Sequence, residues 1–153
     1  AQSSAQTVDR IKAAYIYNFA KFVEFPAAED QMIRLCLLGK GDLNGALPGL
    51  NHRMAQGREI LIRKEVSPEQ VRDCSLVFVA ESEARLLPVV VKQLGGAPVL
   101  LVSDGRQAVD QGAHLALIFN EDRVEFDVNL LNLHKSSIKA SSQMLKLARV
   151  VVR

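Results

Sequence analysis

The 153-residue chain has little excess charge, no long apolar run and only two cysteines. Its 19 basic and 17 acidic residues leave a net charge of +2, too small to argue for nucleic-acid binding, and no run is dense in lysine and arginine. No apolar stretch reaches the roughly 18 residues that a membrane span needs, because Asn18, Lys21 and Glu24 interrupt the longest one. The spacing of Cys36 and Cys74 fits neither a CxxC redox motif nor a zinc site, and the three histidines are scattered. We therefore expect no metal site and no nucleic-acid partner.

Motifs of catalysis and cofactor binding are missing or incomplete. No serine lies in a GxSxG elbow, and neither cysteine has an evident histidine base. The loop from Gly39 to Gly45 invites comparison with the dinucleotide fingerprint GxGxxG, but its third glycine comes one position late. Pro48 and Gly49 also interrupt the helix that should follow. A plain turn is the favoured interpretation, nucleotide binding the less favoured one, and we expect neither a catalytic residue nor a cofactor.

Aromatic residues are scarce, with six phenylalanines, two tyrosines and no tryptophan, yet five of them lie in the segment YIYNFAKFVEFP. At 100° per residue most apolar side chains of this segment share one wide face, and Pro26 ends the pattern, which predicts an amphipathic helix over residues 8–25. Asn18 projects into the apolar face. We expect it to be buried and to bond backbone groups, the alternative being that it faces a cavity or a partner. Tyr17 lies on the polar side.

Short, nearly continuous apolar runs follow Pro26. They are residues 34–39, 59–65, 75–80, 99–104 and 114–120. Such runs are typical of strands that are covered on both faces. A further run, 124–129, follows after so short a link that it must pair with its predecessor as an antiparallel hairpin. The sequence predicts an α/β fold of the Rossmann-like or flavodoxin-like type: three layers, a mostly parallel sheet with an antiparallel edge hairpin, and helices on both faces.

A helix is also predicted over residues 81–96, between two of these strands. Ser82 could cap its start, and Gly95 and Gly96 close it. Pro88 is expected to kink or shorten its first turns.

The C-terminal segment, residues 129–153, has helical periodicity, with a break before a second helix that Ser137 caps and Ile138 begins. Lys139 and Lys146 lie on the polar side of that pattern. This basic stripe is either a solvated face or a surface for an acidic partner.

Polar side chains mark one strand end. Parallel sheets bind ligands at the carboxyl ends of their strands, and Ser103 and Asp104 stand at such an end. They predict a site for a small polar ligand, or else the start of a turn with Gly105 and Arg106.

Taken in order, several segments resemble the YfiR/HmsC (DUF4154) family of periplasmic proteins. The segments are KAAYIYNFAKFVEFP, LCLLG, GREILIRK, CSLVFVAESE, PVLLVSDG, VEFDVNLLNL and SSQMLKLARVVV. They run from about residue 8 to residue 152. The resemblance implies one YfiR-like domain over residues 8–153, and a flexible segment, residues 1–7, that remains after a signal peptide is cleaved on export to the periplasm.

The resemblance also implies a function without catalysis. Family members of this type bind the periplasmic region of an inner-membrane diguanylate cyclase and hold it inactive, which lowers cyclic di-GMP and biofilm formation. An outer-membrane lipoprotein that competes for the repressor and a second copy in a homodimer are further expected partners. Tyr17 is then a candidate contact residue. The alternative is a periplasmic small-molecule sensor with a pocket near Ser103 and Asp104.

Composition alone leaves two free buried thiols as an open interpretation. In the oxidising periplasm that the resemblance implies, Cys36 and Cys74 are instead expected to form a disulfide, since they lie on predicted neighbouring strands. Better-known family members carry a second cysteine pair toward the fifth strand, which this chain lacks.

Overall fold

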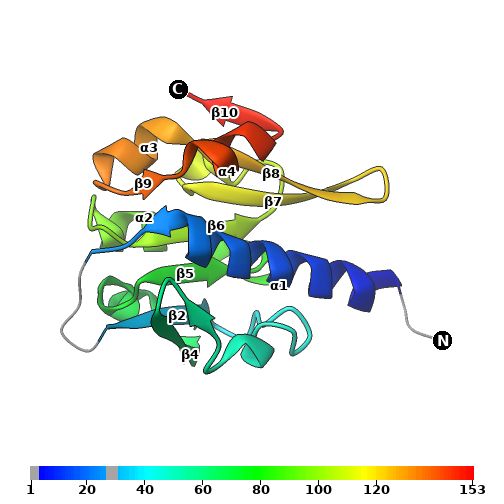
Figure 1. Cartoon of the computed structure of the whole chain (residues 1–153), viewed down its shortest axis with the longest axis horizontal. Coiled ribbons are helices and arrows are strands. Elements are labelled where there is room, and N and C mark those ends of the chain that lie inside the picture. Colours follow the sequence, from blue (N-terminus) through cyan, green and yellow to red (C-terminus); the bar gives the residue numbers. More distant parts are fainter. Residues whose placement is uncertain (1–3, 27–30) are drawn as a thin grey trace.

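The computed structural model describes residues 4–26 and 31–153, in which a sheet lies between two layers of helices (Figure 1). The helices are α1 (Ser4–Phe22), α2 (Leu87–Leu94), α3 (Leu130–Lys135) and α4 (Ser142–Leu147). Short 3-10 helices are η1 (Pro48–Leu50), η2 (Pro68–Asp73), η3 (Glu81–Leu86) and η4 (Val109–Gln111). The large sheet contains β2 (Met32–Leu38), β3 (Met54–Ala55), β4 (Arg58–Val66), β5 (Leu76–Val79), β6 (Leu100–Asp104), β7 (Leu115–Asn120), β8 (Arg123–Asn129) and β10 (Val150–Val152). A separate antiparallel pair joins β1 (Val23–Glu24) to β9 (Lys139–Ala140).

The predicted α/β fold with a mostly parallel sheet is confirmed. The strand order is β10-β8-β7-β6-β5-β2-β4-β3, and β4, β2, β5, β6 and β7 are mutually parallel. The antiparallel hairpin of β7 and β8 is present. It is not the edge of the sheet, however, because β10 pairs with β8 beyond it in parallel orientation. The opposite edge is the short antiparallel strand β3.

Helices cover both faces, which explains the unbroken apolar runs. Along β2, Ile33, Leu35 and Leu37 pack on the side of α1, whereas Cys36 and Leu38 pack on the side of α2. Successive side chains of a strand point to opposite faces, so a strand buried on both needs apolar residues at every position.

Helix α1 sits on the sheet in a different rotation from the one we predicted. Its buried side chains are Lys12, Ala13, Ile16, Phe19 and Ala20, followed by Val23 of β1. The apolar face of α1 is wider than the strip of the helix that the sheet covers. The side chains along one side of this face therefore remain in solvent. As a result Ile11 and Phe22 are 42% and 43% exposed. Asn18 lies between them and is exposed, so the prediction that it is buried is wrong.

The ends of α1 also differ from the predicted range 8–25. The helix already includes residues 4–7, and it ends at Phe22 because Val23 and Glu24 pair with β9 as a strand. Residues 1–3 of the predicted N-terminal segment lie outside the described part of the chain.

The helix predicted over residues 81–96 is divided. The 3-10 helix η3 precedes α2, and Pro88 occupies the first turn of α2, where its missing N–H costs no hydrogen bond. Gly95 ends α2, as predicted, and it does so in the left-handed conformation. Ser82 is not the cap, because η3 follows Ala80 and has no side-chain cap.

The C-terminal prediction was wrong in its secondary structure. Instead of two helices, the segment forms α3, β9, α4 and β10. Ser137 adopts a left-handed turn conformation (φ 57°), and Ser141 is the residue whose hydroxyl caps α4 by accepting from the Met144 N–H at 3.1 Å. The short strands β9 and β10 on each side of α4 pair with β1 and β8, and this non-local pairing outweighs local helical periodicity.

Candidate functional site

A cavity of about 480 Å³ opens where the carboxyl ends of β5, β6 and β7 meet the first half of α1. We call it the strand-end pocket. Its lining includes Lys12 from α1, Glu81 after β5, Asp104 at the end of β6, Arg106 in the following turn and Phe119 on β7. Crevices outside the carboxyl ends of parallel strands are the usual ligand sites of α/β sheets. The predicted position near Asp104 therefore coincides with a real cavity.

An ion pair forms the base of this pocket. The Lys12 ammonium donates to both carboxylate oxygens of Asp104 at 2.9 Å, and the two side chains are each only 10% exposed. Burying a lysine on the inner face of a helix is costly unless a carboxylate compensates it. The pair thus joins α1 to the end of β6 and fixes the rotation of the helix on the sheet.

Lys12 was not among the site residues predicted from the sequence, although a signal was present. At 100° per residue Lys12 projects between Phe19 and Val23, within the apolar sector. A charged side chain in such a sector indicates a buried partner.

The negative charge of the buried Asp104 carboxylate is only partly compensated by its surroundings. Burial raises the pKa of its carboxyl above the ordinary range, whereas the hydrogen bond and charge of Lys12 lower it, and the negative charges of Glu81 and Asp9 raise it further. Because the net shift of this pKa is upward, the surroundings do not fully replace the water that the carboxylate loses.

Ser103 has a structural role in the sheet. It is completely buried, and its hydroxyl donates to the Val79 carbonyl at 2.9 Å, which joins β6 to β5. Of the two residues that predicted a polar site, Asp104 therefore presents charge to the pocket, while the hydroxyl of Ser103 is bonded to backbone.

The glycine-rich loop after β2 is a turn. A Cβ on Gly41 would lie 2.4 Å from the Cβ of Ala80, and one on Gly39 would lie 2.6 Å from a carboxylate oxygen of Glu83. These glycines are needed for close packing, and the group nearest Gly39 is an anion. A phosphate would be repelled there, so the loop does not form a nucleotide cradle.

Tyr17 and Asn18, two predicted contact residues, lie in different environments. The Tyr17 hydroxyl donates to the Met54 carbonyl at 2.6 Å, and the cationic groups of Lys21 and Arg53 lie 4.4 and 4.5 Å from its ring centroid. Tyr17 thus links α1 to β3 and is half-buried. Asn18 is exposed and is accessible to a partner.

Lys139 and Lys146 do not share a helix face. Lys139 lies in β9 opposite Glu24 of β1, whereas Lys146 lies in α4. Both are exposed. The predicted basic stripe of one continuous helix is therefore wrong, because the segment folds into strands on each side of α4.

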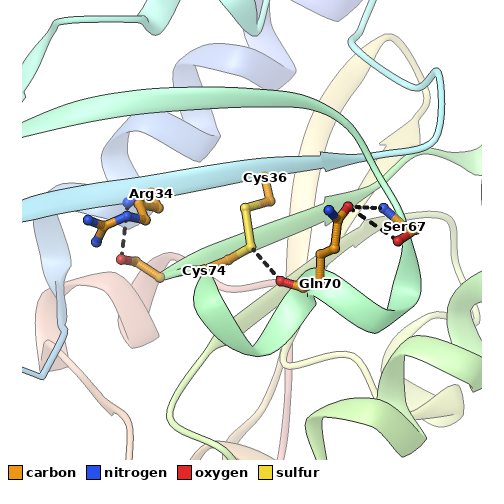
Figure 2. The surroundings of a disulfide bond; sticks show 6 residues. Arg34, Cys36, Ser67, Gln70 and Cys74 are labelled. Carbon is orange, nitrogen blue, oxygen red and sulfur yellow. Dashed lines mark hydrogen bonds between the residues drawn. A yellow bond between two sulfur atoms is a disulfide. The ribbon is translucent and has the colours of Figure 1, made fainter.

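Cys36 and Cys74 form a disulfide inside the layer between the sheet and α2 (Figure 2). Their Cα atoms are 6.1 Å apart, and both residues are buried. The bridge ties β2 to Cys74, which lies two residues before β5. Beside it the Arg34 N–H donates to the Ser75 hydroxyl at 3.1 Å, and the Ser75 N–H donates to the Arg34 carbonyl at 2.8 Å.

A buried histidine was also missed. His114 is 4% exposed, and its Nδ1 accepts from the Leu101 N–H at 2.9 Å while its Nε2 lies 2.8 Å from the Ser136 hydroxyl. Burial lowers the pKa of His114 to about 4. Since Nδ1 accepts, the proton is on Nε2, so this ring cannot act as a base toward Ser136 and instead holds α3 against the sheet. A single histidine at a strand start gave no signal in the sequence.

A second ion pair joins the C-terminal segment to the sheet. Arg149 donates from Nε and a terminal nitrogen to the two oxygens of Asp127 at 3.0 and 2.7 Å. Asp127 is 3% exposed, and this two-point contact with the guanidinium is what compensates its charge.

Neither a metal centre nor a membrane span is found in the described ranges, 4–26 and 31–153. No cluster of three or more histidine, cysteine, aspartate or glutamate side chains there could hold a metal ion. No helix in that part of the chain combines the length and apolar character needed to cross a bilayer.

Two solved structures share the fold. A conserved domain protein from Vibrio cholerae matches with a TM-score of 0.61 and 8% identity over 94% of this chain and 60% of its own. The ABC domain from Streptococcus pneumoniae, in complex with L-Trp, matches with a TM-score of 0.58 and 9% identity over 97% of this chain and 60% of its own. The present chain thus spans about 60% of the length of each. At such low identity these likenesses show the fold alone.

A family model extends over nearly the whole domain. The YfiR/HmsC-like model (DUF4154) matches residues 9–149, from the second turn of α1 to the loop before β10. That range includes the disulfide, the strand-end pocket and the predicted contact residues. The chain belongs to the YfiR/HmsC-like family, whose members are in general periplasmic, regulatory and non-catalytic.

Proposed function

We propose that this protein is a periplasmic repressor that binds the periplasmic region of an inner-membrane diguanylate cyclase and keeps the enzyme inactive. The observation that carries the proposal is the family match over residues 9–149. Repression by sequestration requires an accessible binding surface and no turnover. The buried disulfide supports a periplasmic location, because such bonds persist in oxidising compartments.

The outer face of α1 is the partner surface that we favour. We define this face by Ile11, Ala14, Asn18 and Phe22, which are exposed and recur every three or four residues. Apolar side chains around one polar amide, with Lys21 at the margin, form a surface typical of a helix that docks to another protein. Asn18 is thus a contact candidate because it is exposed. Lys139 and Lys146 remain secondary candidates, on separate elements.

Cyclic di-GMP in the native host tests this function. Deleting the gene should raise its concentration, and deleting the cyclase gene as well should return it to baseline, because the repressor acts only through that enzyme. Complementation with the Phe22→Ser or Ile11→Ser variant should fail to restore repression. Val89→Ser is the matched control, since Val89 is 44% exposed but lies on α2, on the opposite face of the sheet.

Unchanged cyclic di-GMP in the deletion strain, both at rest and under envelope stress, would end the repressor proposal. If the deletion has its effect but the two α1 variants complement fully, the contact surface lies elsewhere. A homodimer and an outer-membrane lipoprotein that competes for the repressor are further proposed partners, and they can be sought by crosslinking in the same strains.

A second function, sensing a small molecule, is favoured by one specific observation. The strand-end pocket has the volume of a small-molecule site and combines charged and apolar side chains at the usual position in this class of fold. A ligand retained through purification and detected by native mass spectrometry would support this function.

A further inference from the structure

The charged side chains of the strand-end pocket are not equally satisfied. Lys12 and Asp104 bind each other at the base, and Arg106 donates to the Asn120 side-chain oxygen at 2.9 Å. Glu81 is exposed and has no hydrogen-bond or ion-pair partner among the described residues. The pocket therefore has one carboxylate without a partner, close to a second carboxylate that is incompletely compensated.

Glu81 and Asp104 together favour a cation. They line both the strand-end pocket and the adjoining hollow, where Lys40 lies with Asp42. Burial is the main cause of the raised pKa of Asp104, and the negative charge of Glu81 adds to it. A positive charge between them would interact favourably with both. An anion would have to approach two carboxylates, and the two cations of the lining are already bonded, Lys12 to Asp104 and Arg106 to Asn120.

The rest of the pocket fits an apolar body. Phe119 is 47% exposed, and the exposed Ala84 lies in the same lining. An inorganic ion would leave these groups uncovered, and the described residues include no cluster of three ligating side chains for a metal. An organic ammonium ion could instead use both parts, with its charge at the carboxylates and its carbon skeleton on the phenyl ring.

We propose that the strand-end pocket binds a small organic amine, with the ammonium group between Glu81 and Asp104 and the apolar body against Phe119 and Ala84. This inference rests on the sensor function proposed above and is independent of cyclase repression.

The test uses two probes with the same ring and opposite charges. The full ¹⁵N-labelled chain is titrated with 2-phenylethylamine and, separately, with 3-phenylpropanoate, and amide shifts are followed by NMR. The amine should shift the amides of residues 81, 104–106 and 117–119, and the acid should not. Glu81→Gln should weaken amine binding about fivefold, the effect of one exposed ion pair, and Arg106→Gln should strengthen it. Glu69→Gln is the matched control, because Glu69 is an exposed carboxylate outside the pocket.

Other results of the NMR titration would overturn the amine inference. If 3-phenylpropanoate shifts the same amides as strongly, the pocket selects anions, and the amine inference fails while the sensor function stands. Amine binding that is unaffected by Glu81→Gln would also overturn the inference. If neither probe shifts these amides, the amine inference fails. The sensor function is then judged by native mass spectrometry of the purified protein, and cyclase repression by cyclic di-GMP.

Discussion

His114 should make the stability of this protein fall in mild acid. Burial lowers the pKa of its imidazole from the ordinary 6.5 to about 4, so between these values the unfolded chain binds a proton that the folded chain excludes. The free energy of unfolding must then decrease as the pH falls from 6.5 toward 4. Linkage gives a loss of about 2 kcal/mol between pH 7 and pH 5 and about 3 kcal/mol by pH 4. The contacts of the ring agree with this lowered pKa. A proton on Nδ1 would face the Leu101 N–H, which is itself a donor. Among the described residues, the only charged side chain that lines the adjacent cavity is Lys135, and its positive charge would repel an imidazolium.

The His114→Gln variant isolates this contribution. A glutamine at this position retains one acceptor and one donor but does not titrate in this range. Urea unfolding at pH 7 and pH 5 should show that the native protein loses about 2 kcal/mol more than the variant over this interval, since the titration of other groups is common to both. His134→Gln, at an exposed position of α3, should behave like the native protein. Parallel pH dependence in the native protein and His114→Gln would refute the reasoning.

Three further outcomes are expected. Denatured, unreduced protein should show no free thiol, and two titratable thiols would contradict the disulfide. The Cys36–Cys74 bridge spans a sequence separation of 38. Reducing it should therefore lower the free energy of unfolding by roughly 4 kcal/mol in the chain-entropy model. Lys12→Met should lower the free energy of unfolding by about 3 kcal/mol, because it leaves Asp104 buried without its partner. Adding Asp104→Leu should recover most of this loss in denaturant unfolding. A double variant as unstable as the single one would count against a stabilising ion pair. Tyr17→Phe should cost about 1 kcal/mol in thermal or urea unfolding, because it removes the hydrogen bond to β3, and should preserve repression; lost repression at unchanged stability would make Tyr17 a contact residue instead.

The central sheet was predictable because its signal is local and strong. Each parallel strand is covered on both faces, so its sequence is an apolar run bounded by turns, and the run 75–80 contains the whole of β5. The disulfide was expected from the periplasmic location that the family resemblance implies, and the observed order β4-β2-β5 makes the predicted strands neighbours, with Cys36 bonded to Cys74. The edge strands were harder to predict from the sequence. Strand β10 has only three residues, and its pairing with β8 depends on contacts that no local pattern encodes.

The candidate site was predictable in position but not in composition. The carboxyl end of β6 is where this class of fold binds ligands, and that rule led to Asp104. Its partner lies 92 residues earlier in the sequence, and no spacing rule connects a lysine in the first helix to the fourth parallel strand. Ser103 has a side chain like that of a ligand-binding residue, yet the alternation of the strand turns it to the other face, where its hydroxyl bonds to Val79.

The rotation of α1 connects these observations. A helix with a wide apolar surface can lie on a sheet in several rotations with similar burial, so hydrophobicity alone does not choose among them. Lys12 determines the rotation of α1, because only a rotation that brings its ammonium group to Asp104 avoids an unpaired charge in the interior. The same rotation leaves Ile11, Asn18 and Phe22 in solvent. The residue that completes the base of the strand-end pocket is therefore also the one that determines which side of α1 is available to a partner, so the two proposed sites depend on a single ion pair.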